Sequence, residues 1–147
     1  SLISKFKAAG YKLGLISDGW ASVQKNKWSS LGLNGFFDYV LFTDDLGREF
    51  WKPHPKAFEK MVEMAGVKFE ESVYVADNPV KDFEAPNKLG MQSLSVVRYG
   101  GEYSTLKPSK HSNKSSYEIK SINELNELLE QVVNQEGELR VEKACEV

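Results

Sequence analysis

Residues 72–82 read Ser-Val-Tyr-Val-Ala-Asp-Asn-Pro-Val-Lys-Asp, and this stretch is the strongest indication of the fold. After the initial serine, the next four residues are apolar, which predicts a short buried strand. The Asn-Pro pair then predicts a turn, after which a helix is expected over residues 79–89, strained or kinked at Pro86. Asp77 and Asp82 therefore flank a turn between a strand and a helix.

The same alternation of strand and helix recurs along the chain. Strand character is found again in three apolar segments, residues 12–17, 39–43 and 92–97. Helical periodicity is found in three others, residues 20–31, 55–66 and 121–133. Residues 98–116 are rich in Gly, Ser and Lys and are predicted to form a long surface loop. The sequence therefore predicts an α/β fold, a Rossmann-like parallel sheet flanked by helices.

Length and composition limit the functions that the chain can have. It has 147 residues, of which 41% are hydrophobic and 27% charged, with a net charge of −2. That balance argues against a nucleic-acid binder and against a general membrane binder. The single cysteine, Cys145, cannot form an internal disulfide, and no apolar stretch approaches the ~20 residues of a bilayer span. A cytoplasmic protein is expected, with neither nucleic acid nor a membrane as its partner.

Polar residues come at the end of the first expected strand. In open parallel sheets, ligands bind beyond the carboxyl ends of the strands, where backbone N–H groups converge. Ser17 ends this strand, and Asp18 and Gly19 follow it directly. The hydroxyl and the backbone amides of these residues could hold a phosphate oxygen, because Gly19 lets the backbone approach closely. An ordinary helix cap is the alternative explanation of the same three residues.

Asp77 and Asp82 are candidate metal ligands. Carboxylates on a turn suit Mg²⁺, which keeps several waters and takes only one or two carboxylates. Asn78, between them, is a weaker candidate. The alternative is structural: Asp77 ends its strand, and Asp82 supplies negative charge to the start of the following helix.

Lys52 is a candidate for charge neutralisation. It precedes Pro53, so its backbone is expected to be extended just before a helix begins. An ammonium group there could offset crowded carboxylates and a phosphoryl group. A surface charge is the alternative explanation of an isolated lysine. Arg98 and the loop over residues 99–114 lie near the same edge, where a solvated loop is the alternative to a contact with substrate.

In this order, Ser17, Lys52, Asp77 and Asp82 resemble the second, third and fourth motifs of the haloacid dehalogenase (HAD) superfamily of hydrolases. The resemblance extends over residues 1–125. It implies a phosphatase of small phosphorylated metabolites, in which Ser17 binds the phosphoryl oxygens and Lys52 offsets charge as the catalytic residues of this chain. It further implies that Asp77 holds Mg²⁺ and that Asp82 orients the surroundings of the metal.

The family's first motif is missing. No Asp-x-Asp-x-[Thr/Val] occurs in the 147 residues, and in this family that motif supplies the nucleophile that becomes an aspartyl phosphate. The resemblance therefore predicts the carboxyl-terminal part of a larger HAD-type phosphatase, without the first motif and the cap, and inactive alone. The alternative is a non-catalytic phosphate-binding or assembly domain. Asp18, where Asn is more familiar, places a negative charge beside the phosphate pocket.

The missing motif also has a structural consequence. In the family its strand lies mid-sheet, between the strands that here end at Ser17 and Ala76, so the sheet is expected to be incomplete. A missing amino-terminal segment or a homodimer could complete it. Residues 1–135 are interpreted as a partial HAD-like core domain and residues 136–147 as a tail. The tail is either a strand, paired within the sheet or with another chain, or a linker.

Overall fold

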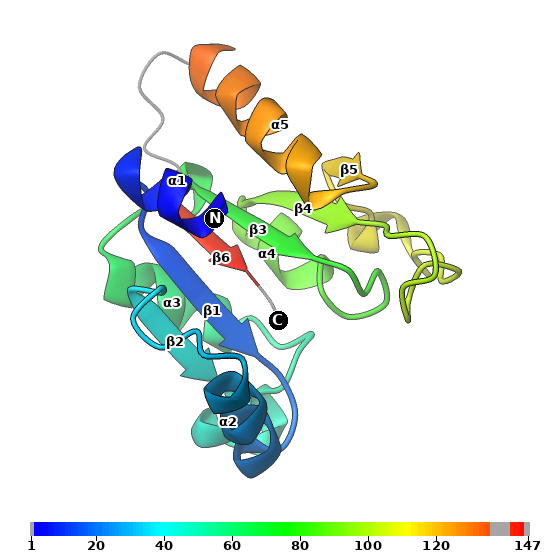
Figure 1. Cartoon of the computed structure of the whole chain (residues 1–147). Helices are drawn as coiled ribbons and strands as arrows, with labels where there is room; N and C mark the ends of the chain where they lie inside the picture. Colours follow the sequence, from blue (N-terminus) through cyan, green and yellow to red (C-terminus); the bar gives the residue numbers. More distant parts are fainter. Residues whose placement is uncertain (1, 136–141, 146–147) are drawn as a thin grey trace.

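The computed structural model describes residues 2–135 and 142–145. Its centre is a six-stranded sheet in the order β2-β1-β6-β3-β4-β5, in which all neighbouring strands are parallel (Figure 1). The strands are, in chain order, β1 Leu13–Ser17, β2 Tyr39–Phe42, β3 Ser72–Ala76, β4 Gln92–Val96, β5 Tyr117–Ile119 and β6 Glu142–Cys145. The predicted α/β fold with a parallel sheet flanked by helices is confirmed.

Helices cover both faces of the sheet. They are α1 Leu2–Ala8, α2 Ala21–Ser30, α3 Lys56–Ala65, α4 Glu84–Leu89 and α5 Ile122–Gln135, with 3₁₀ turns at Thr43–Leu46, Arg48–Phe50, Phe69–Glu71 and His111–Asn113. Successive side chains of a strand point to opposite faces, so Val75 packs with Phe6 and Leu125 on the side of α1 and α5. Tyr74 packs with Phe58 on the other side, where α3 and α4 lie. None of the described helices is both long and apolar enough to cross a membrane.

The strands β1 and β3 are buried along their whole length. All five residues of each are buried, as expected for strands that are covered on both faces. Gly14 lets α3 pack closely against β1, because a Cβ at this position would lie 2.6 Å from Sδ of Met61. The two strands are thereby fixed against the helices, and so are the positions of Ser17 and Ala76 at their ends.

The helix predicted over residues 79–89 is wrong at its start, because α4 begins at Glu84. The backbone carbonyl of Asn78 accepts a hydrogen bond from the N–H of Asp82 at 3.1 Å, which closes a turn where a helix was expected. Pro86 is consequently in the first turn of α4. Its missing N–H costs no helical hydrogen bond there, so the predicted strain does not arise at this residue.

The strand β6 lies between β1 and β3. Its Lys143 is in register with Leu13 on one side and with Val73 on the other. The sequence predicted that this position would lack its strand, and residues 142–145 of the same chain occupy it. They pair with residues 72–75 of β3 and with Leu13 and Gly14 of β1. The rest of the tail over residues 136–147 lies outside the described residues, and the domain boundary before it stays a prediction.

The loop predicted over residues 98–116 leads into β5, a strand that the sequence pattern did not predict. Ile119 of β5 is buried in the core. The loop itself is attached to α4, because Nδ2 of Asn87 donates to the carbonyls of Ser112 and Lys114 at 2.9 and 2.8 Å. These bonds hold the loop beside the carboxyl ends of β3 and β4.

Candidate active site

The candidate residues gather at the carboxyl edge of the sheet. Ser17 is the last residue of β1, and Asp77 directly follows β3. Both line a cavity of about 520 Å³, together with Asp18, Lys81 and Arg98. This is the position at which open parallel sheets bind their ligands.

Lys52 and Asp82 form a buried ion pair. Nζ of Lys52 lies 2.9 Å from Oδ1 of Asp82, and both side chains are 0% exposed. Lys52 also donates to the hydroxyl of Tyr74 at 3.1 Å, and Oδ2 of Asp82 accepts from the backbone N–H of Asn78 at 3.0 Å. Lys52 is therefore not a surface charge, and the pair fixes the start of the turn that follows β3.

Asp77 has different surroundings. In the part of the chain that the structure describes, its carboxylate accepts no hydrogen bond from another residue. Burial raises the pKa of Asp77 above its ordinary value of 3.8, and the negative charge of Asp82 adds to this effect, while the positive charge of Arg98 opposes it. A cation bound at this carboxylate would favour its charged form, so the site is electrostatically suited to a metal ion.

Ser17 lines the cavity, and neither Ser17 nor Gly19 caps a helix. Ser17 is 4% exposed, and its Oγ donates to Oε1 of Gln24 at 3.2 Å. Gly19 has a φ of 105°, which favours glycine. The helix α2 starts only at Ala21, whose N–H donates to the carboxylate of Asp44 at 2.9 Å. The helix-cap alternative is therefore not what the structure has.

Asp18 is held by donors of the protein itself. Its Oδ1 accepts from Oγ1 of Thr43 at 2.8 Å and from the backbone N–H of Lys52 at 2.9 Å, and its Oδ2 lies 3.1 Å from Nζ of Lys81. Burial alone would raise the pKa of Asp18, but these hydrogen bonds and the charge of Lys81 outweigh it and lower the pKa below 3.8. Both oxygens of the Asp18 carboxylate therefore have partners, and the bond to the N–H of Lys52 connects the end of β1 to that residue.

The three predicted metal ligands differ in what their oxygens already bind. Both oxygens of Asp82 accept hydrogen bonds, and Oδ1 of Asn78 accepts from the N–H of Val80 at 3.0 Å. Over residues 2–135 and 142–145, no group of three or more His, Cys, Asp or Glu could hold a metal ion. The donor set therefore fits Mg²⁺ bound through the carboxylate of Asp77, with water or phosphate oxygens as its other ligands.

Two residues around the site were not predicted from the sequence. They are Gln24 and Lys81. Lys81 stands next to Asp82 in the stretch over residues 72–82, so its position near the site could have been inferred. Gln24 gave no signal, because it lies on α2, which has no buried residue.

The chain is similar in sequence to several phosphatases. Residues 1–96 match the family described as haloacid dehalogenase-like hydrolase. The glyceraldehyde 3-phosphate phosphatase of Methanopyrus kandleri is 34% identical over 123 residues, which are 84% of this chain and 51% of that protein. A phosphoserine phosphatase of Thermus thermophilus is 30% identical over 98 residues, 67% of this chain and 39% of that protein. The chain spans about half the length of the curated relatives it matches.

Solved structures have the same fold. The HAD phosphatase from Thermococcus onnurineus has a TM-score of 0.71 at 31% identity, over 86% of this chain and 54% of that chain. The magnesium-bound HAD-hydrolase YfnB from Bacillus subtilis has a TM-score of 0.72 over 87% of this chain and 53% of that chain, and at 22% identity it shows the fold alone. The sequence match and these relatives show that the chain belongs to the haloacid dehalogenase-like hydrolases.

Proposed function

We propose that this chain supplies the phosphate-binding and magnesium-binding half of a phosphatase that hydrolyses small phosphate monoesters. One observation carries the proposal: Ser17 and Asp77 come from different strands and line one cavity at the carboxyl edge of the sheet. The names of the relatives support hydrolysis of a phosphate ester. The dependence on magnesium rests on the carboxylate of Asp77 and on the properties of the family.

Each residue has a role that follows from its surroundings. The Ser17 hydroxyl would donate to a phosphoryl oxygen, exchanging its bond to Gln24 for one to the ligand. Asp77 would hold Mg²⁺, and the cation would supply positive charge to the phosphoryl oxygens. Lys52 contributes a fixed positive charge from the interior, and Asp82 is a positioning residue that holds both Lys52 and the turn after β3.

The nucleophile has to come from elsewhere. None of the 147 residues forms an Asp-x-Asp-x-[Thr/Val] motif, so the transfer of the phosphoryl group to an aspartate needs a segment that this sequence does not contain. We therefore propose that the isolated chain does not turn over phosphate esters. Catalysis belongs to a longer polypeptide in which these residues are combined with the first motif.

A second candidate is a non-catalytic domain that binds phosphate or takes part in an assembly. The observation that favours it is β6, because residues 142–145 pair with both β1 and β3 at the centre of the sheet. A strand that carries the nucleophile cannot occupy the same position at the same time. The two candidates therefore make different predictions for a longer polypeptide.

The substrate proposal is a small phosphorylated metabolite, as in the relatives named for glyceraldehyde 3-phosphate and phosphoserine. We place the reaction in the cytoplasm, and we propose neither nucleic acid nor a membrane as a partner. In a longer polypeptide, an additional amino-terminal segment would take the central position in the sheet that β6 occupies here. A second copy of the chain is the other proposed partner.

The test is a magnesium-dependent phosphatase assay on this chain beside a polypeptide extended upstream through the natural reading frame. p-Nitrophenyl phosphate and glyceraldehyde 3-phosphate serve as substrates, and Asp77→Ala in each polypeptide is the control. We expect hydrolysis only by the longer polypeptide, and loss of it in the variant. Hydrolysis by the short chain that disappears in Asp77→Ala would refute its proposed inactivity. Hydrolysis by neither polypeptide would favour the non-catalytic domain.

A further inference from the structure

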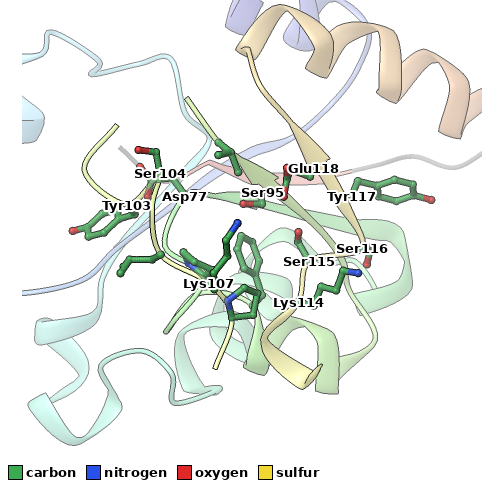
Figure 2. A pocket seen from close by; sticks show the side chains of 15 residues that line it. Asp77, Ser95, Tyr103, Ser104, Lys107, Lys114, Ser115, Ser116, Tyr117 and Glu118 are labelled. Carbon is green, nitrogen blue, oxygen red and sulfur yellow. The ribbon is translucent and has the colours of Figure 1, made fainter. Parts of the chain in front are cut away.

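A second cavity adjoins the candidate active site. It has a volume of about 370 Å³ and lies between the carboxyl ends of β3 and β4, the start of β5 and the loop that joins β4 to β5 (Figure 2). Asp77 and Tyr103 line this cavity and also the one that contains Ser17. A ligand whose phosphoryl group is bound beside Ser17 and Asp77 therefore has a second, unassigned space next to it. The volume is at the lower end of those that hold small molecules.

A buried hydroxyl group in this cavity has no hydrogen-bond partner among the residues that the structure describes. Ser95 of β4 is 5% exposed, and over the described residues its Oγ makes no hydrogen bond. Ser93, two residues earlier on the same face of the strand, is different, because its Oγ donates to Oδ1 of Asn87 at 2.6 Å. A buried polar group is nearly always paired, so the Ser95 hydroxyl points to a ligand or a water in the cavity.

Two ammonium groups lie on the wall of the same cavity. Lys107 and Lys114 form no ion pair with any described residue. Figure 2 shows the side chain of Lys107 extending into the cavity toward Ser95. The opposing charges are the carboxylates of Asp77 and of Glu118, which is the register partner of Ser95 on β5. Because Asp77 is assigned to the metal in the first cavity, the charged groups left on this wall are the two lysines and Glu118. Their net charge is positive, which favours an anionic ligand.

Part of the remaining wall is apolar. Phe83 is 1% exposed, and it lines the cavity together with Val97 and Leu106. A short carbon skeleton would pack against these side chains, while its polar groups meet Ser95 and Lys107.

We propose that this cavity binds the organic part of the substrate, and that this part is a short hydroxy acid. The carboxylate of this acid binds the ammonium group of Lys107, and a second hydroxyl group, one that is not esterified to phosphate, pairs with the hydroxyl of Ser95. The proposal rests on the phosphate site proposed above and adds the class of the leaving group: a phosphate ester that carries a carboxylate at its other end.

The experiment measures the affinity of the full chain for three probes by isothermal titration calorimetry in the presence of Mg²⁺. The probes are inorganic phosphate, glycerol 3-phosphate and 3-phosphoglycerate. The two esters share a three-carbon skeleton, and they differ in that the acid has a carboxylate where glycerol 3-phosphate has a hydroxymethyl group. We expect 3-phosphoglycerate to bind about fivefold more tightly than glycerol 3-phosphate, since a carboxylate–ammonium contact at a partly exposed site is modest.

Variants separate the two cavities. Lys107→Gln should remove the preference for 3-phosphoglycerate without changing the affinity for inorganic phosphate, and Lys107→Arg should retain most of the preference. Glu118→Gln should act in the opposite direction and increase the affinity for 3-phosphoglycerate, because it removes a like charge. Ser17→Ala should weaken the binding of all three probes by a similar factor.

The outcomes distinguish this proposal from the phosphate site on which it rests. If the two esters bind with equal affinity, Lys107→Gln leaves both affinities unchanged and inorganic phosphate still binds, the proposed binding of the acid in the second cavity is refuted and the phosphate site is not. No binding of any probe would overturn the phosphate site and this proposal together. Binding of 3-phosphoglycerate that Ser17→Ala leaves unchanged would show that no single ligand extends between the two cavities, which would also overturn the proposal.

Discussion

Asp77 and Asp82 are five residues apart on the connection between β3 and α4, yet they lie in different surroundings. The Asp82 side chain is fully buried, and its oxygens are engaged by Lys52 and by the backbone N–H of Asn78. The Asp77 carboxylate lines the cavity beside Ser17 and accepts no hydrogen bond from another described residue. The same residue type therefore has two roles in one motif: Asp82 holds the turn in place, and Asp77 is available to a ligand.

The largest effect is expected from Asp82→Ala. This substitution leaves the Lys52 ammonium group buried without that carboxylate, which should lower the free energy of unfolding by about 3–5 kcal/mol, as measured by urea denaturation. The exposed pair of Lys25 and Asp45 is a matched control with the same 2.9 Å separation, and its side chains are 51% and 50% exposed. Asp45→Ala should cost less than about 1 kcal/mol.

A double variant tests whether the buried charge is the cause. Lys52→Met combined with Asp82→Leu replaces the ion pair by apolar side chains and should recover most of the stability lost in Asp82→Ala. If Asp82→Ala cost no more than Asp45→Ala, the buried pair would not hold the turn, and the contrast between Asp77 and Asp82 would fail.

A smaller effect, with a defined pH dependence, is expected from Asp18→Asn. The pKa of Asp18 lies below 3.8 in the folded protein, so its ionised form contributes stability that is fully present well above pH 3.8. At pH 7 the variant should be about 1–3 kcal/mol less stable, because bonds from Thr43, Lys52 and Lys81 to a charged acceptor are weakened.

This stability difference should narrow as the pH falls below about 4, since wild-type Asp18 is then increasingly protonated. Denaturation of both proteins between pH 3 and pH 7 measures it. A difference that stays constant over this range would show that the charge of Asp18 is not what links β1 to Lys52.

The smallest effect on stability is expected from Asp77→Asn. The carboxylate accepts no hydrogen bond from another described residue, so the free energy of unfolding without metal should change by no more than about 0.5 kcal/mol at pH 7. The same urea denaturation measures it. A loss as large as that in Asp82→Ala would mean that Asp77 also holds the turn.

The sequence predicted the parts of the molecule in which local pattern and burial agree. The strand over residues 72–76 was predicted with the bounds that the structure has. A short run of apolar residues is typical of a parallel strand that is covered by helices on both faces. Ser17 and Asp77 were predicted to meet, since the carboxyl ends of parallel strands share one edge of the sheet.

The parts that depend on distant contacts could not be predicted in the same way. The late start of α4 follows from the turn that the backbone N–H of Asp82 closes. The side chain of Asp82 is bound by Lys52, which is 30 residues away in the sequence, so this turn depends on a distant contact. The burial of Lys52 is likewise set by tertiary structure. A surface charge was the alternative explanation of this lysine, and its side chain is fully buried. The second cavity is formed by a loop without repeating pattern, and no spacing in the sequence indicated that Ser95 and Lys107 would line it together.

The strand β6 shows the same limit at the centre of the sheet. Residues 142–145 read Glu-Lys-Ala-Cys, which is more polar than β1 or β3 on either side. The weak alternation of polar and apolar residues in the tail was compatible with a strand or with a linker. Residues 142–145 form a strand because the backbone groups of β1 and β3 are there to pair with them.

A Mg²⁺ titration followed through the backbone amide signals in ¹H–¹⁵N NMR spectra tests most directly whether Asp77 is the metal-binding residue of the proposed phosphate site. In wild-type protein with inorganic phosphate present, the amides of residues 76–78 should shift and reach saturation. Asp77→Asn should weaken this binding at least tenfold, and Asp45→Asn, which removes an exposed carboxylate, should leave it unchanged. Shifts that persist in Asp77→Asn, or that centre on residues 44–45, would contradict the assignment of Asp77 as the residue left available for the metal.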